Sequence, residues 1–402
     1  MNFALLGFTP AVRPILQALR AASGHQLVHA VNVGQALAEL LLDFPGLRSS
    51  ENWSDLFDTA SVDFVIVAGS APEVLEGTRN LAAAGQSLAL VPEVGQGLDL
   101  IYELSLIQDD NHVTLLPVMP LRTHSQLLLL REALMREELG ELLHLEFERF
   151  SSSPLFGATD RDRCFLDDVA VLRWLAGNYS QITATESRSE NDGISRSTAA
   201  LAGTGCPAAA WTLRSGSPQD RWCLAVVGER GSIQLECDVE SGAMQLTSNT
   251  LTFPESGTAG PSDAQVAAQA LVDGLAVDAD RPKTFPEWDE LTKVFETADA
   301  VRRSLRRRRT IDLHFEQASE RGLFKTQMAA LGCGVLMFTL FGLVAYLIVA
   351  SLFELPVAVL QTLRALWMLP LFVYLLLQGL LLITRPSRRK TEPTASVSGD
   401  AQ

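Results

Sequence analysis

The chain has 402 residues, of which 47% are hydrophobic, and its formal net charge is −15. This length suits two globular domains with a further segment. The acidic balance argues against nucleic-acid binding, and the five cysteines show no Cys-x-x-Cys spacing, so neither a metal site nor a disulfide framework is expected.

The first part of the chain alternates short apolar strands with helices. Strands are predicted at residues 3–6, 26–33, 62–68, 87–91 and 113–117, and helices at 11–22, 36–42, 72–84 and 98–109. This alternation is typical of a parallel sheet with helices on both faces. We therefore predict an α/β fold, with a Rossmann-type doubly wound parallel sheet, for residues 1–120.

The pattern changes after residue 120, where strand-like runs follow one another with few helices between them. Strands are predicted at residues 142–150, 181–187, 198–202, 208–213, 222–227, 232–236 and 310–315, and helices at 127–139, 167–175, 263–273 and 287–303. This order predicts an α+β domain with a mixed or antiparallel sheet over residues 121–316. The last helix ends in a cluster of arginines at 302–309, which suits either anionic lipid headgroups or a solvated helix end.

Two long apolar runs follow, and they predict a membrane hairpin. Residues 326–353 and 365–384 contain no Asp, Glu, Lys or Arg, and a helix needs about 20 residues to cross a hydrocarbon core. Basic residues flank the outer ends of the hairpin, which favours cytoplasmic chain termini. We expect an inner-membrane protein with two transmembrane helices that contacts membrane lipid, and a disordered cytoplasmic tail at 385–402. The alternative is a buried helical hairpin in a soluble domain.

Several short motifs in the first 315 residues resemble those of one enzyme family. They are Ala-Gly-Gln-Ser at 84–87, Leu-Gly-Glu-Leu-Leu at 139–143, Leu-Arg-Trp-Leu-Ala-Gly at 172–177 and Gly-Glu-Arg-Gly-Ser-Ile at 228–233. Together with the order of elements, they resemble the Gfo/Idh/MocA family of glucose-fructose oxidoreductase and inositol dehydrogenase. The resemblance implies NAD or NADP as cofactor, a sugar-like ligand, and homo-oligomers formed through the sheet of the second domain.

The turn after the first strand departs from the dinucleotide-binding pattern. It begins with Gly7, but Thr9 and Val12 occupy the positions of the second and third glycines. Thr9 adds a Cβ where phosphate oxygens would lie, Pro10 lacks an N–H group, and Asn32 replaces the acid expected to hold a ribose hydroxyl. Gly7, Thr9 and Asn32 are the candidate cofactor residues, for a weakly held nucleotide or for a domain that holds none.

The catalytic positions implied by the resemblance are also changed. Pro92 stands where the family has Lys, and Asp167 stands where it has His. A general base needs a pKa near the working pH, which an Asp attains only if burial raises it. Glu93, His124 and Asp167 are the candidate catalytic residues, and the alternative is that they are polar groups lining a wet cleft.

These observations favour a membrane-anchored, oxidoreductase-like protein that is divergent or catalytically inactive. It would serve as a cytoplasmic ligand-binding or scaffold module, because two glycines, the Lys and the His are replaced together. The alternative is an active NAD(P)-dependent oxidoreductase that acts on a sugar or polyol through a rearranged site.

Overall fold

The computed structural model describes residues 1–22, 24–57, 62–153, 156–189, 193–253, 262–275, 285–313 and 337–344. The chain divides into two compact units, Met1–Phe315 and Glu316–Gln402. The predicted spans and the predicted tail lie outside the described residues, except that 337–344 are helical. Within the part of the chain that is described, no helix combines the length and the apolar character needed to cross a membrane.

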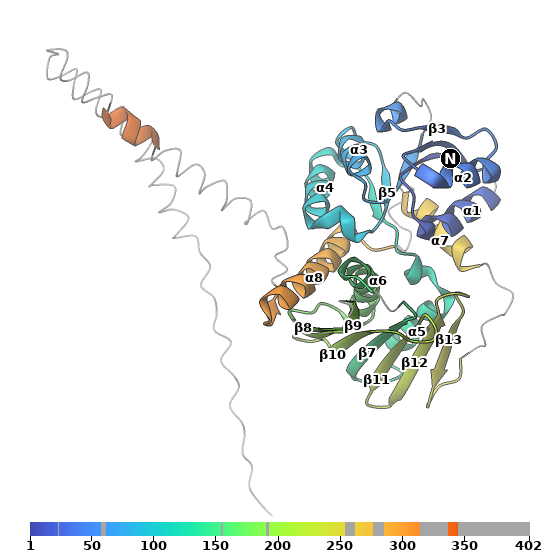
Figure 1. Ribbon diagram of the computed structural model, residues 1–402, viewed down its shortest axis with the longest axis vertical. Coiled ribbons are helices and arrows are strands. Elements are labelled where there is room, and N and C mark those ends of the chain that lie inside the picture. The colour runs from blue at the N-terminus through green and yellow to red at the C-terminus, as the bar shows by residue number, and fades with distance from the viewer. Residues whose placement is uncertain are drawn as a thin grey trace, which may run out of the picture. The chain divides into compact units, whose positions relative to one another are not determined.

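The first sheet has six parallel strands in the order β3-β2-β1-β4-β5-β6, with helices on both faces (Figure 1). Its apolar strands match the prediction of a doubly wound sheet, whereas the short polar edge strand β3 is not predicted. Between β1 and β4 the strand order reverses, and the carboxyl ends of the strands leave a crevice there. The elements are β1 Asn2–Leu6, α1 Arg13–Ala21, β2 Gln26–Val31, α2 Leu37–Asp43, β3 Arg48–Ser50, β4 Phe64–Ala68, α3 Pro72–Ala83, β5 Leu88–Val91, α4 Gly97–Asn111 and β6 Leu115–Pro117, with short 3-10 turns η1 Pro10–Val12, η4 Val94–Gln96 and η5 Pro120–Thr123.

Gly7, directly after β1, is required by backbone packing. Its φ of 75° lies in the left-handed region, and a Cβ there would lie 2.2 Å from the carbonyl oxygen of Ala68, at the end of β4. The close approach of β1 to β4 therefore explains this glycine without any nucleotide.

The second sheet has eight strands in the order β13-β12-β11-β7-β10-β9-β8-β14. Only β7 and β10 run parallel to each other, which confirms the predicted mixed sheet. Helix α6 packs on this sheet, with Phe165 of α6 edge-on to Trp211 of β10 at 5.0 Å between ring centroids. The elements are α5 Ser125–Met135, β7 Leu142–Ser151, α6 Ala158–Ala176, β8 Gln181–Arg188, β9 Ile194–Ala202, β10 Ala208–Ser215, β11 Arg221–Gly228, β12 Gly231–Asp238, β13 Met244–Ser248, α7 Asp263–Leu275, α8 Trp288–Arg307 and β14 Ile311–Asp312.

Two late helices join the sheets into one unit. Helix α7 returns to the first sheet, where Ala267 and Leu271 share a core with Ile15 of α1. Helix α8 packs on the opposite face of that sheet, where the buried indole Nε1 of Trp288 donates to the Ile101 carbonyl of α4 at 3.1 Å. The space between the two sheets is therefore bounded by elements that belong to one folded body.

Replacing Gly7 with Ala should destabilise the protein strongly, because the new Cβ meets the Ala68 carbonyl. We expect a loss of about 3 kcal/mol or more in the free energy of unfolding, from left-handed strain and overpacking combined. Urea unfolding followed by tryptophan fluorescence measures it. The control is Gly85→Ala, where φ is 83° and nothing lies within 4 Å of the added Cβ, so only about 1–2 kcal/mol is expected. Equal losses in both variants would contradict the packing explanation.

Candidate functional site

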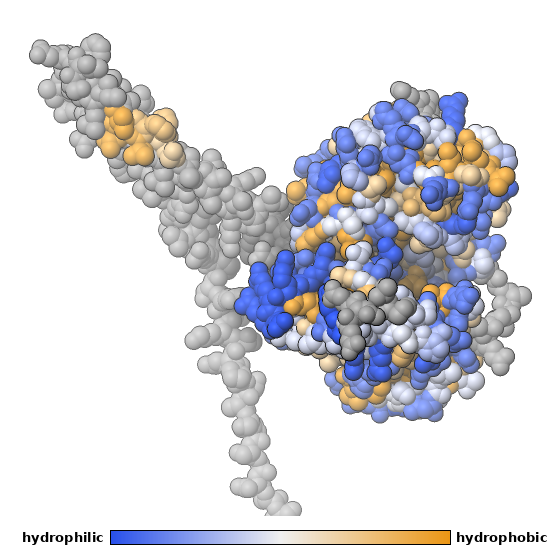
Figure 2. Space-filling model, viewed as in Figure 1, coloured by the Kyte–Doolittle hydropathy of each residue, from blue (hydrophilic) through white to orange (hydrophobic). Residues whose placement is uncertain are grey.

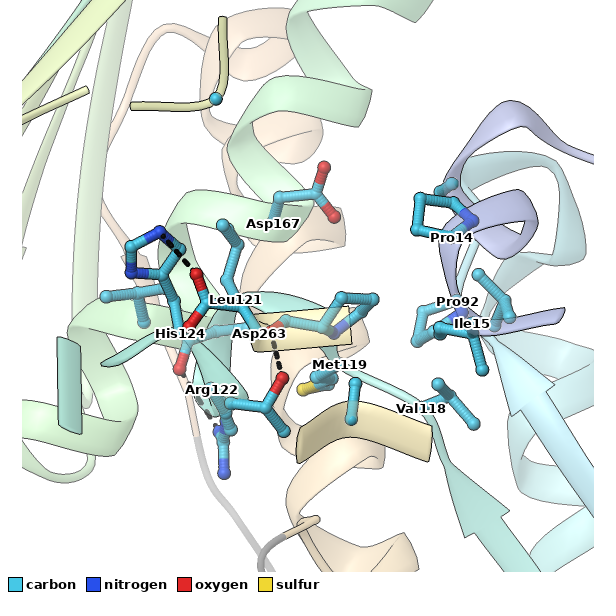
Figure 3. Close-up of a pocket in the computed structure, with 18 of the residues that line it drawn as sticks. Pro14, Ile15, Pro92, Val118, Met119, Leu121, Arg122, His124, Asp167 and Asp263 are labelled. Atoms are coloured by element: carbon cyan, nitrogen blue, oxygen red, sulfur yellow. Dashed lines mark hydrogen bonds and ion pairs between the residues drawn. The ribbon is translucent and has the colours of Figure 1, made fainter. Parts of the chain in front are cut away.

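A cavity of about 790 Å³ lies between the two sheets, within the range of small-molecule sites. Figure 3 shows the start of α1 and the end of β5 on one side and α6 on another, with the segment around η5 between them. The wall is mainly apolar, and its principal residues are Thr9, Pro10, Pro14, Ile15, Val91, Pro92, Glu93, Val118, Met119, Leu121, Arg122, His124, Arg149, Arg163, Leu166, Asp167, Ala170, Trp222, Asp263, Ala264, Ala267 and Val294.

The structure brings all three candidate catalytic residues to this cavity. Glu93 reaches it from the loop after β5, His124 from the start of α5, and Asp167 from α6. Of the candidate cofactor residues, Thr9 lines the cavity, whereas Gly7 and Asn32 do not. The position of a residue in the cavity wall does not test its chemical role, so the catalytic and cofactor-binding roles stay predictions.

Asp167 is aimed into the cavity by the residue that follows it. Asp168 is fully buried and accepts hydrogen bonds from Arg149 Nε at 2.9 Å and from Trp211 Nε1 at 2.8 Å, while a second Arg149 nitrogen completes the ion pair. Successive residues of a helix diverge by about 100°. With Asp168 held against the sheet, the carboxyl group of Asp167 points into the open space opposite Pro14 (Figure 3).

The electrostatic surroundings of Asp167 suit proton transfer. Desolvation within the cleft, with the charges of Asp168 and Glu93, raises the pKa of Asp167 to about 7, against the opposing charges of Arg149 and Arg163. The side chain itself is exposed to the solvent of the cavity, so water screens this effect until a ligand displaces it. A carboxylic acid that titrates near neutrality can serve as a general acid or base.

His124 is held in a structural contact and pairs with a residue other than Asp167. Its Nδ1 accepts from the backbone N–H of Gln126 at 3.2 Å, which leaves the proton on Nε2 facing Asp263 Oδ2 at 3.1 Å. Burial lowers the pKa of His124, although Asp263 and the Gly242 backbone oppose this shift. With both ring nitrogens engaged, His124 joins α5 to the start of α7, where the backbone N–H of Ser125 also donates to Asp263.

Arg122 is a second buried cation at this site that sequence patterns do not identify. It is 1% exposed, pairs with Glu290, and donates to the Ala170 carbonyl at 3.1 Å. Its guanidinium lies 5.4 Å from the ring centre of Trp174, a cation–π contact. Arg122 and Arg149 therefore each form an ion pair with a carboxylate of the protein. Arg163 is the third arginine of the cavity wall.

The residues at the start of α1 do not fit the pyrophosphate of a dinucleotide. Such a group binds to backbone N–H groups at a helix N-terminus and to a close glycine turn. Here Pro10 and Pro14 lack N–H groups, Ile15 adds an apolar side chain, and the N–H of Val12 already donates to the Thr9 carbonyl at 3.1 Å. Since Asn32 at the end of β2 lies outside the cavity, the ribose-binding side of the crevice is not part of it either.

Solved structures with low sequence identity share this fold. One is a putative myo-inositol dehydrogenase from Sinorhizobium meliloti 1021, at 16% identity and a TM-score of 0.62, covering 78% of this chain and 100% of that one. An oxidoreductase from Agrobacterium radiobacter, in complex with NAD⁺, L-tartaric acid and magnesium, matches at 14% identity and 0.62, covering 78% and 98%. The aldose-aldose oxidoreductase of Caulobacter crescentus matches at 16% and 0.62, covering 78% and 99%.

The chain has the fold of the Gfo/Idh/MocA-type oxidoreductases. No protein-family model matches the sequence, and no curated protein matches it. The fold expected from the short motifs is therefore confirmed. The activity and the ligand have to be inferred from the residues of the site.

The raised pKa of Asp167 predicts a specific pH dependence of stability. Between the ordinary value of 3.8 and about 7 the folded state binds more protons at this carboxyl than the unfolded state, so the free energy of unfolding falls as pH rises through this window. Asp167→Asn should remove this slope in urea unfolding measured across the window. Asp289→Asn, at a carboxyl with 63% side-chain exposure, is the matched control and should keep it. A wild-type slope equal to that of Asp167→Asn would refute the assignment.

Proposed function

We propose that this protein is a membrane-anchored, oxidoreductase-like ligand-binding protein whose cleft holds a small molecule without relying on a dinucleotide. One contrast carries the proposal. The cavity of about 790 Å³ receives an acid from each side, Glu93 and Asp167, whereas Pro10, Pro14 and Ile15 form the wall where a pyrophosphate would bind. A site built in this way is suited to one compact ligand.

The residues of the cavity wall indicate which chemical groups that ligand carries. Asp167 and Glu93 accept hydrogen bonds from hydroxyl groups, and Arg163 supplies a cation at the same wall. The apolar residues Ile15, Pro92 and Val118 would contact a carbon skeleton. A sugar-like or polyol-derived molecule with at least one apolar face meets both requirements.

Membrane anchoring rests on the sequence and on one described helical stretch. Residues 326–353 and 365–384 are free of charged side chains. In the helical residues 337–344, Phe338, Leu340 and Phe341 are 55%, 56% and 66% exposed, and exposed apolar side chains of this kind suit contact with lipid. The proposal is an inner-membrane protein with two spans and both termini in the cytoplasm.

A second proposal concerns self-association through the open face of the second sheet. Ala200, Ala208 and Ala210 on neighbouring strands are exposed there, beside His144 of β7, which is level with Ala208. A flat surface of small residues allows a second copy of the sheet to approach closely. We propose that the protein forms homo-oligomers through this face.

An active NAD(P)-dependent oxidoreductase is the alternative, and one observation favours it. Asp167 occupies the position that the resemblance gives to the family's catalytic His, and its pKa is raised to about 7. A carboxyl group that titrates near neutral pH suits general acid–base catalysis. The wall at Pro10 and Pro14 argues against the cofactor, so the two functions are separated by measuring cofactor binding.

NAD⁺, NADH, NADP⁺ and NADPH at millimolar concentration should leave the melting temperature of the full-length protein in nanodiscs unchanged. A ligand with a Kd above the millimolar range stabilises by less than about 0.4 kcal/mol when its concentration is one millimolar. A clear upward shift with any of them would contradict the proposal and support the alternative. In that case Asp167→Asn should lower turnover by roughly 10²–10⁴-fold, and Asp289→Asn should not.

The membrane hairpin predicts that the full-length protein stays in the membrane pellet after alkaline carbonate extraction. A chain ending at residue 315 should be released into the supernatant, because it lacks both apolar runs. Equal release of the two forms would show that the apolar runs do not anchor the protein.

A further inference from the structure

Four consecutive arginines form an exposed cluster where α8 ends. Arg306 to Arg309 are all exposed, and with Arg302 and Arg303 they place six of the 32 basic residues within one short segment of an acidic chain. Figure 2 shows strongly hydrophilic surface over this end of α8. Such a concentration of positive charge needs a physical explanation.

The fold presents these arginines on a fixed turn. Arg308 has a φ of 52°, in the left-handed region, which ends the helix. The buried hydroxyl of Ser304 donates to the Arg309 carbonyl at 2.8 Å and accepts from the Ala184 N–H of β8 at 2.9 Å. These bonds fix the turn to β8, next to the short edge strand β14 of the second sheet.

Contacts within the protein do not account for this charge. Arg302 and Arg303 form ion pairs with Asp299, and Arg302 also with Asp162, but no ion pair joins Arg306–Arg309 to another described residue. Basic residues in the last turn of a helix offset its dipole, which explains Arg306 and Arg307. Arg308 and Arg309 lie beyond the helix, where that effect ends.

We propose that Arg306–Arg309 are a docking surface for the anionic headgroups of a phospholipid membrane. This inference deepens the membrane anchoring proposed above and rests on it for the choice of partner. The apolar run that starts at residue 326 begins fewer than twenty residues beyond Arg309, so the turn would stay within about 60 Å of the bilayer. Guanidinium groups bind phosphate oxygens in a bidentate manner, which suits a cluster of arginines without lysine.

Vesicle sedimentation of the unit Met1–Phe315 tests the docking surface alone, because this compact unit holds both hydrophobic cores and lacks the apolar runs. At low salt it should bind vesicles of phosphatidylcholine mixed with phosphatidylglycerol and should not bind phosphatidylcholine alone. Substitution of Arg306–Arg309 by glutamine should weaken binding about fivefold for each arginine, since one basic residue contributes about 1 kcal/mol near an anionic surface. Added salt should weaken wild-type binding.

The matched control removes four exposed arginines elsewhere in the same unit, as R79Q/R136Q/R188Q/R214Q. Their side chains are 38–64% exposed and pair with carboxylates. Because four arginines are replaced in each case, this variant has the same net charge as the quadruple substitution at the turn. It should bind the mixed vesicles like the wild type. Equal binding by both variants, equal binding to phosphatidylcholine alone, or no binding to the mixed vesicles would overturn the proposal. None of these results would bear on carbonate extraction of the full-length chain.

Discussion

The buried pair of Arg149 and Asp168 is the interaction on which the cleft depends. It ties β7 to α6, and Trp211 of β10 holds the same carboxylate. Removing one partner of a buried ion pair leaves an uncompensated charge, at a cost of about 3–5 kcal/mol. The same pair fixes the direction of Asp167 and places a positive charge beside it. This one contact therefore positions the helix that carries Asp167, while burial is the main cause of the raised pKa of that carboxyl group.

A second constraint explains how a Rossmann-type frame persists without a pyrophosphate cradle. Gly7 is kept because the carbonyl of Ala68 leaves no room for a Cβ, so its presence says little about a cofactor. Thr9 and Pro10 follow in the same turn, where a dinucleotide-binding motif would offer a glycine and a backbone N–H group. Pro suits the first turn of a helix, where its missing N–H has no partner within the helix. The substitutions thus keep the strand–turn–helix geometry while removing the groups that bind phosphate.

The sequence predicts an element well where burial produces a clear hydrophobic pattern. It predicts poorly those features that depend on contacts between residues far apart in the chain. β4 is apolar throughout and fully buried, so its strand was evident. β3 is short, polar and on the sheet edge, which leaves no periodicity to detect. The cavity residues Glu93 and Asp167 follow from the resemblance and the strand order. The pairing of His124 with Asp263 does not, because nothing local in either segment requires the other.

Helix α8 gives the cleft and the arginine turn a common rigid support. Val294 on this helix lines the cavity, and Arg306 lies twelve residues further along, about 18 Å at 1.5 Å per residue. An acidic body is repelled by an anionic bilayer except where a basic surface faces it. If the turn docks on headgroups, α8 therefore sets both the orientation of the globular unit and the height of its cavity above the lipid. A ligand held in that cavity would then be kept close to the membrane surface whatever chemistry it undergoes there.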